Sequence, residues 1–141
     1  MFETLLSRLM KNKPKAFLIE DSDILAELIS FELKRNFNCD VITFKNGDNI
    51  ISDINYNIPD VIILDYNFND NSLKLKNGLE VLVCIRRLYD IPVILFSGQK
   101  NKSKSKDLLD AGANCYISKD DDEFMEDLMS FIENTLRIKQ S

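Results

Sequence analysis

The sequence predicts an α/β fold, in which a doubly wound, five-stranded parallel sheet is covered by helices on both faces to give three layers. Two observations lead to this prediction. Short and nearly continuous apolar runs, such as Ala16–Ile19 and Val61–Leu64, are typical of strands that are buried on both faces. These runs alternate with segments of helical periodicity, and such an alternation favours a right-handed parallel sheet, here in the order 2-1-3-4-5.

Five strands are expected along the chain. Pro59 and Pro92 mark the entries of two of them, where a missing backbone N–H costs least. The expected strands lie near residues 15–20, 39–44, 60–65, 92–97 and 114–118.

Five helices are expected between and after these strands. Ser22 or Asp23 is a suitable N-cap for the first helix, Gly78 begins the third, and Gly112 ends the fourth. The apolar positions of the first helix recur at i, i+3 and i+4 and predict a stripe that faces the core: Leu25, Leu28, Ile29, Leu33 and Phe37. The expected helices lie near residues 23–36, 47–56, 78–90, 103–111 and 121–137.

The chain divides into an N-terminal extension, residues 1–13, and one domain, residues 14–138. The extension is expected to contain a short amphipathic helix in residues 1–11, whose apolar positions share one helical face: Phe2, Leu5, Leu6 and Leu9. This helix either packs on the surface of the domain or serves in docking or dimerisation, and the sequence leaves both interpretations open.

The composition argues against several classes of function. The net charge of −5 disfavours nucleic-acid binding, and no apolar run approaches the ~20 residues that cross a bilayer, so neither nucleic acid nor membrane is an expected partner. The scattered Cys39, Cys84 and Cys115 are typical of reduced thiols and predict a cytoplasmic protein. Because the chain of 141 residues contains no histidine, histidine-based catalysis and histidine metal ligands are excluded.

Polar residues stand where four of the predicted strands end. Glu20 and Asp21 follow the first strand, Asp65 closes the third, Ser97 closes the fourth, and Lys119 follows the fifth. Because the carboxyl ends of parallel strands share one edge of a sheet, these side chains are expected to meet there.

This set of side chains suits a metal ion and a phosphoryl group. Carboxylate oxygens select Mg²⁺ or Ca²⁺, while a lysine and a hydroxyl neutralise and hydrogen-bond a phosphoryl group. Asp65 can then act as the nucleophile and form an aspartyl-phosphate. The alternative is a structural ion pair between Lys119 and one carboxylate, with the other carboxylates hydrated.

Residues 15–137 resemble the receiver domain of bacterial two-component response regulators, which has a flavodoxin-like fold. The resemblance rests on the spacing from Asp21 to Asp65 and from Ser97 to Lys119, on Asn77-Gly78-Leu79-Glu80 at the start of the third helix, and on Gly112-Ala113 before the fifth strand.

The resemblance implies a role for each residue of the site. Asp65 would be the phosphorylated aspartate, and Lys119 would contact the phosphoryl group. Mg²⁺ would be the cofactor, bound by Asp21, by Asp65 and by the backbone carbonyl of Asn67, with Glu20 acting through a metal-bound water.

The resemblance also implies a switch. Ser97 would move toward the phosphoryl group and Tyr116 would change rotamer with it, although Tyr116 is otherwise an ordinary half-buried strand aromatic. A histidine kinase or a phosphotransfer protein would phosphorylate the domain, and an unidentified protein would read its state. A homodimer could form through residues 1–11 or through helix 103–111, strand 114–118 and helix 121–137.

We expect this domain to be a signalling switch and not an enzyme, beyond its own phosphorylation from a donor and its own dephosphorylation. The chain ends at Ser141, so a stand-alone switch is expected. Phosphatases that form an aspartyl-phosphate carry a second acid two residues after the nucleophile, and Asn67 cannot serve as one.

Two departures from the family pattern keep a second interpretation open. Asp120 replaces the usual proline after Lys119, so the bond between them is expected to be trans, with a shifted loop around the lysine. Residues 66–77 form a longer loop than is typical. The alternative function is therefore a receiver-like scaffold that binds partners without being phosphorylated.

Overall fold

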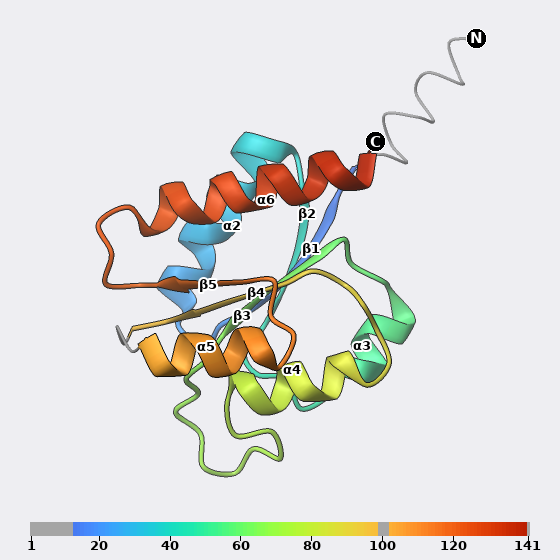
Figure 1. Cartoon of the computed structure of the whole chain (residues 1–141). Coiled ribbons are helices and arrows are strands. Elements are labelled where there is room, and N and C mark those ends of the chain that lie inside the picture. Colours follow the sequence, from blue (N-terminus) through green and yellow to red (C-terminus); the bar gives the residue numbers. More distant parts are fainter. Residues whose placement is uncertain (1–12, 99–101, 141) are drawn as a thin grey trace, which may run out of the picture.

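The computed structural model describes residues 13–98 and 102–140 of the chain. The strands are β1 (Lys15–Ile19), β2 (Asp40–Phe44), β3 (Val61–Asp65), β4 (Val93–Ser97) and β5 (Cys115–Ser118). They form one sheet in the order β2-β1-β3-β4-β5 with every neighbouring pair parallel, which confirms the predicted topology (Figure 1). All five strands therefore end at the same edge of the sheet.

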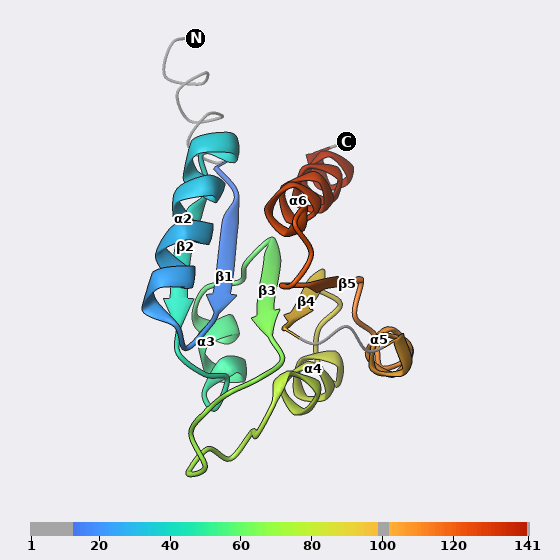
Figure 2. The same ribbon diagram turned by 90° about the vertical axis from the view of Figure 1, so that its left-hand side faces the viewer.

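Helices cover both faces of this sheet and complete the predicted three layers. The helices are α2 (Asp23–Phe37), α3 (Ile50–Tyr56), α4 (Gly78–Arg86), α5 (Lys102–Asp110) and α6 (Phe124–Gln140). Helices α2 and α6 lie on one face of the sheet, and α3, α4 and α5 lie on the other (Figures 1 and 2).

Neighbouring residues of a strand contribute to opposite layers of the core. Phe17 packs in the cluster that includes α3, α4 and α5, while Leu18 packs in the cluster that includes α2 and α6. Ile62 and Ile63 divide in the same way. Every residue of β3 and β4 is buried, which explains why these strands appear in the sequence as unbroken apolar runs.

Helix α2 has the predicted start, but one residue of its apolar stripe lies outside the core. The hydroxyl of Ser22 accepts a hydrogen bond from the N–H of Leu25 at 3.4 Å and caps the helix. Ile29 and Leu33 are buried, whereas Leu28 is 50% exposed, so its predicted core position was wrong. Adjacent residues of an α-helix are turned by about 100°, which places Leu28 outside the face that Ile29 presents to the sheet.

Helices α3 and α6 begin three residues later than predicted, because turns precede them. Gly47 lies in the turn before α3 and packs on α4, where an added Cβ would lie 2.6 Å from Val81 Cγ2. Before α6, the N–H of Phe124 donates to the carbonyl of Asp121, and the carboxylate of Asp121 accepts the N–H of Glu123.

Helix α4 ends at Arg86 rather than at residue 90, because Arg86 itself holds the chain that follows in a turn. Its guanidinium donates to the carbonyls of Tyr89 at 3.2 Å, Ile91 at 2.8 Å and Gly112 at 2.9 Å. Gly112 has a φ of 111° and follows α5, as the sequence predicted.

The predicted helix in residues 1–11 lies outside the described residues and stays a prediction. Within residues 13–98 and 102–140, no helix combines the length and the apolar character that crossing a bilayer requires.

Candidate functional site

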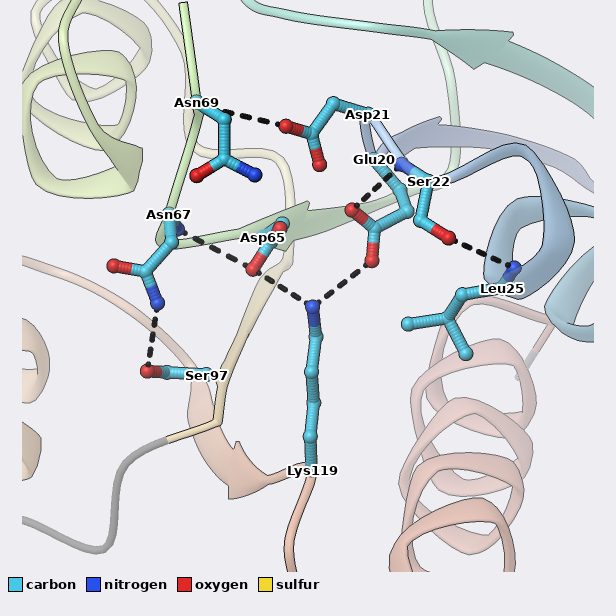
Figure 3. Close-up of polar contacts among 9 residues, drawn as sticks. All are labelled: Glu20, Asp21, Ser22, Leu25, Asp65, Asn67, Asn69, Ser97 and Lys119. Atoms are coloured by element: carbon cyan, nitrogen blue, oxygen red, sulfur yellow. Dashed lines mark hydrogen bonds and ion pairs between the residues drawn. The ribbon is translucent and has the colours of Figure 1, made fainter.

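Four strands deliver polar side chains to one edge of the sheet, as the sequence predicted (Figure 3). Asp65 and Ser97 are the last residues of β3 and β4, while Glu20 and Lys119 directly follow β1 and β5. Glu20, Asp65 and Ser97 are the buried polar residues of the described chain, with at most 3% of each residue exposed. Such burial of two carboxyl groups is costly unless a cation compensates for it.

Lys119 is the cation that reaches the buried carboxylates. Its Nζ lies 2.9 Å from Oε1 of Glu20 and 3.2 Å from Oδ1 of Asp65, and its side chain is 24% exposed (Figure 3). Burial is the largest single influence on the pKa of Lys119 and lowers it. The two carboxylates together more than offset this effect and raise the pKa above its ordinary value. Lys119 is therefore fully charged at neutral pH.

The carboxylates outnumber this lysine. Oxygen atoms of Glu20, Asp21 and Asp65 all lie within 4.8 Å of one another. Burial raises the pKa of Glu20, and the neighbouring Asp65 raises it further, because a second negative charge disfavours ionisation. Among the described residues, three carboxylates lie beside one ammonium and leave excess negative charge, and this donor set fits a hard divalent cation such as Mg²⁺.

Asn67 connects the acidic cluster to Ser97. Its backbone N–H donates to Oδ1 of Asp65 at 3.3 Å, and its side-chain Nδ2 donates to Oγ of Ser97 at 3.3 Å (Figure 3). The role of the Asn67 backbone carbonyl as a metal ligand stays a prediction. The link between its amide and Ser97 was missed, since spacing alone does not show which rotamer a side chain adopts.

Asn69 contributes a contact that the sequence did not predict. Its backbone N–H donates to Oδ2 of Asp21 at 3.2 Å (Figure 3). Asn69 belongs to the segment between β3 and α4, which we call the β3–α4 loop (residues 66–77). This loop therefore contacts a predicted metal ligand directly.

Gly78 allows helix α4 to begin against the end of β3. A Cβ at this position would lie 2.7 Å from the carbonyl oxygen of Asp65 and 2.8 Å from Cα of Tyr66. The side chain of Asn77 caps the helix by accepting the N–H of Glu80 at 3.0 Å. Glycine at residue 78 thus brings α4 close to the phosphoacceptor candidate.

Tyr66 and Tyr116 both pack against the core cluster that includes Leu108 of α5. Lys104 of α5 places its Nζ 3.6 Å from the centre of the Tyr66 ring, a cation–π contact beside Asp65. Tyr116 lies on β5, is half-buried, and packs against the cluster that includes Leu108. Its role as a switch stays a prediction.

The chain around Lys119 retains the expected trans geometry. No described peptide bond is cis, so the bond from Lys119 to Asp120 is trans. The backbone N–H of Lys119 donates to the carbonyl of Ser97 at 2.8 Å, which continues the β4–β5 pairing past the end of β5. This bond keeps the lysine at the edge of the sheet without the usual proline.

Comparison with known proteins gives one matching family and several relatives. The sequence model of the response regulator receiver domain matches residues 16–132. A protein-glutamate methylesterase/protein-glutamine glutaminase of Bacillus subtilis (strain 168) is 30% identical over 122 residues, which are 84% of this chain and 33% of that protein. The transcriptional regulatory protein KdpE of Staphylococcus aureus (strain NCTC 8325 / PS 47) is 32% identical over 105 residues, 74% of this chain and 43% of that protein.

The chain thus spans less than half the length of these two relatives. Among solved structures, the receiver domain of the Francisella response regulator 1452 superposes with a TM-score of 0.76 at 22% identity, covering 90% of this chain and 99% of that chain. At this level of identity the superposition supports the fold alone.

Proposed function

This chain belongs to the receiver-domain family of two-component response regulators, and from that membership we propose that it is a Mg²⁺-dependent phosphoacceptor switch in which Asp65 receives the phosphoryl group. The observation that supports this proposal most strongly is the environment of Asp65. Its carboxylate is buried, lies 3.2 Å from the ammonium of Lys119, and shares an acidic cluster with Glu20 and Asp21.

Asp65 acts as the nucleophile in this proposal. One of its carboxylate oxygens forms a bond to phosphorus while the bond from phosphorus to the donor breaks, and the donor group leaves with the bonding electron pair. The donor is a phosphohistidine of a histidine kinase or phosphotransfer protein, or a small acyl phosphate. Asn67 N–H and Lys119 both contact Oδ1 of Asp65, so they hold the carboxylate in one orientation before transfer.

Charge neutralisation supplies the rest of the chemistry. Lys119 offsets negative charge that develops on the phosphoryl oxygens. Mg²⁺, when bound, would neutralise the same oxygens, and Asp21, Asp65 and the carbonyl of Asn67 would hold it, with Glu20 acting through a water molecule. Beyond its own phosphorylation and dephosphorylation, the domain needs no catalytic activity.

The output of the switch is a change in partner binding. A phosphoryl group on Asp65 favours a second arrangement of Ser97 and Tyr116, and a partner that prefers this arrangement then binds more tightly. A hollow between β5 and α6, lined in part by Tyr116 and Phe131, lies on the face where we expect a partner or a second copy to bind. Three free thiols are typical of a reducing compartment, so we expect the switch to act in the cytoplasm.

Intact mass spectrometry tests this proposal. The protein is incubated with acetyl phosphate or phosphoramidate, with Mg²⁺ or with EDTA, and the wild type is compared with Asp65→Ala and with Asp23→Ala. Asp23 is an exposed carboxylate beside the site, so its variant is a matched control. We expect a Mg²⁺-dependent gain of one phosphoryl group in the wild type and the control, lost on treatment with hydroxylamine, and no gain in Asp65→Ala. A wild type that is neither phosphorylated nor able to bind beryllofluoride would favour the unphosphorylated scaffold instead.

A further inference from the structure

The β3–α4 loop is fastened to the body of the domain by a residue outside the acidic cluster. The carboxylate of Asp48, in the turn before α3, accepts the N–H of Leu75 at 2.8 Å and the N–H of Lys74 at 3.0 Å. These two bonds lower the pKa of Asp48, because they stabilise its charged form, and the bond from Leu75 has the larger effect. Asp48 therefore holds the loop through two hydrogen bonds to a charged acceptor, which are stronger than neutral ones.

A second, apolar anchor holds the same part of the loop. Leu73 is 6% exposed although its neighbours Ser72 and Lys74 are exposed, and the nearby Leu75 packs against the core cluster that includes α3 and α4. Contacts within the loop stiffen it further: the carboxylate of Asp70 accepts the N–H and the hydroxyl of Ser72 at 2.9 and 2.6 Å. The loop is thus fastened by one polar anchor and one apolar anchor.

The near end of the loop lies against the predicted metal ligands. The N–H of Asn69 donates to Oδ2 of Asp21, and the N–H of Asn67 donates to Oδ1 of Asp65 (Figure 3). Asp21 is only half-buried, so without the Asn69 contact its carboxylate could rotate into solvent. A hydrogen bond from an outer residue to a metal ligand orients that ligand and raises metal affinity.

We propose that Asp48 and Leu73 are positioning residues for the acidic cluster: by fastening the β3–α4 loop, they keep the Asn69 N–H on Asp21 and so increase the affinity of the site for Mg²⁺. The inference rests on the proposed function in one respect, since it takes Glu20, Asp21 and Asp65 as the Mg²⁺ site. Its physical reason is preorganisation, because a carboxylate already held in one orientation loses less conformational freedom when it binds.

The test measures metal binding alone, without a phosphodonor. Mg²⁺ is titrated by calorimetry, and Mn²⁺ by electron paramagnetic resonance, into the wild type and into variants whose folding is verified by circular dichroism. Asp48→Ala and Leu73→Ala are each expected to weaken binding by about tenfold, the lower end of the range for residues that orient metal ligands. Asp48→Asn, which keeps one acceptor oxygen, is expected to lie between the wild type and Asp48→Ala.

Two comparisons distinguish an effect of loop position on Mg²⁺ affinity from an effect of net charge. Asp53→Ala removes the same charge from the neighbouring helix α3 and is expected to bind like the wild type, whereas Leu73→Ala changes no charge at all. If Leu73→Ala binds Mg²⁺ as tightly as the wild type, or if Asp53→Ala weakens binding as much as Asp48→Ala, the inference is wrong. Where Leu73→Ala does not fold, Leu73→Val is titrated in its place. A wild type that binds no Mg²⁺ would instead overturn the proposed function, and the inference with it.

Discussion

Replacing Asp21 by asparagine should stabilise the metal-free protein and abolish its stabilisation by Mg²⁺. The carboxylate oxygens of the acidic cluster lie within 4.8 Å of one another. Two like charges at that separation repel by about 3.5 kcal/mol at an effective dielectric constant of 20. Lys119 offsets part of this repulsion, and water screens the half-buried Asp21. We therefore expect the free energy of unfolding without metal to rise by about 1 kcal/mol, or roughly 3 °C in Tm.

Asparagine changes little else at this position. Its side-chain oxygen can still accept the N–H of Asn69, so the contact to the β3–α4 loop is retained. The wild type should gain about 1.4 kcal/mol when free Mg²⁺ is tenfold above its Kd, and about 2.7 kcal/mol at a hundredfold excess, while the variant should gain almost nothing. The order of stability is thus expected to reverse when metal is added.

Urea unfolding in EDTA and in saturating MgCl₂ measures both effects. Asp23→Asn is the matched control, because Asp23 is an exposed carboxylate paired with Lys45 at 2.7 Å and lies outside the cluster. The control should be stabilised by Mg²⁺ as the wild type is. A lower stability of Asp21→Asn than of the wild type in EDTA, or equal stabilisation of the two proteins by Mg²⁺, would contradict the role given to Asp21.

Three further predictions concern the core of the site and one buried thiol. Lys119→Met leaves Glu20 and Asp65 without their cation, so the free energy of unfolding of the metal-free protein should fall by about 2–4 kcal/mol in urea while its Mg²⁺ affinity rises. Unchanged stability would argue against the ion pairs. Gly78→Ala forces a Cβ against the carbonyl of Asp65 and should cost about 1–3 kcal/mol in the same assay, and a neutral result would show that α4 can shift away. Burial raises the pKa of Cys39 from 9.0 to about 11, so the native state keeps a proton that the unfolded chain releases. Stability should therefore fall as pH rises through this window, by at most about 2–3 kcal/mol, and Cys39→Ala should show a shallower decline in thermal unfolding.

The strand ends were predictable because the signals for them are local. Unbroken apolar runs identify strands buried on both faces, and a polar residue at the end of such a run must lie where the strand leaves the core. Glu20, Asp65, Ser97 and Lys119 were all placed at one edge of the sheet in this way, and the structure brings them there. One failure occurred where the sequence does not show which face of a helix meets the sheet. Leu28 fits the helical period but lies outside the face that α2 presents to the sheet.

The topology of the sheet and the members of the acidic cluster follow from the amino-acid pattern alone, because the apolar runs and the handedness of their connections leave few alternative arrangements. The contacts that hold the acidic cluster in place are visible only in the folded protein. The β3–α4 loop has no periodicity, and its backbone N–H groups bind acceptors that lie far away in the chain. Asp48 and Asp21, both outside the loop, accept bonds from Leu75 and Asn69, and such pairings exist only once the sheet has brought these segments together.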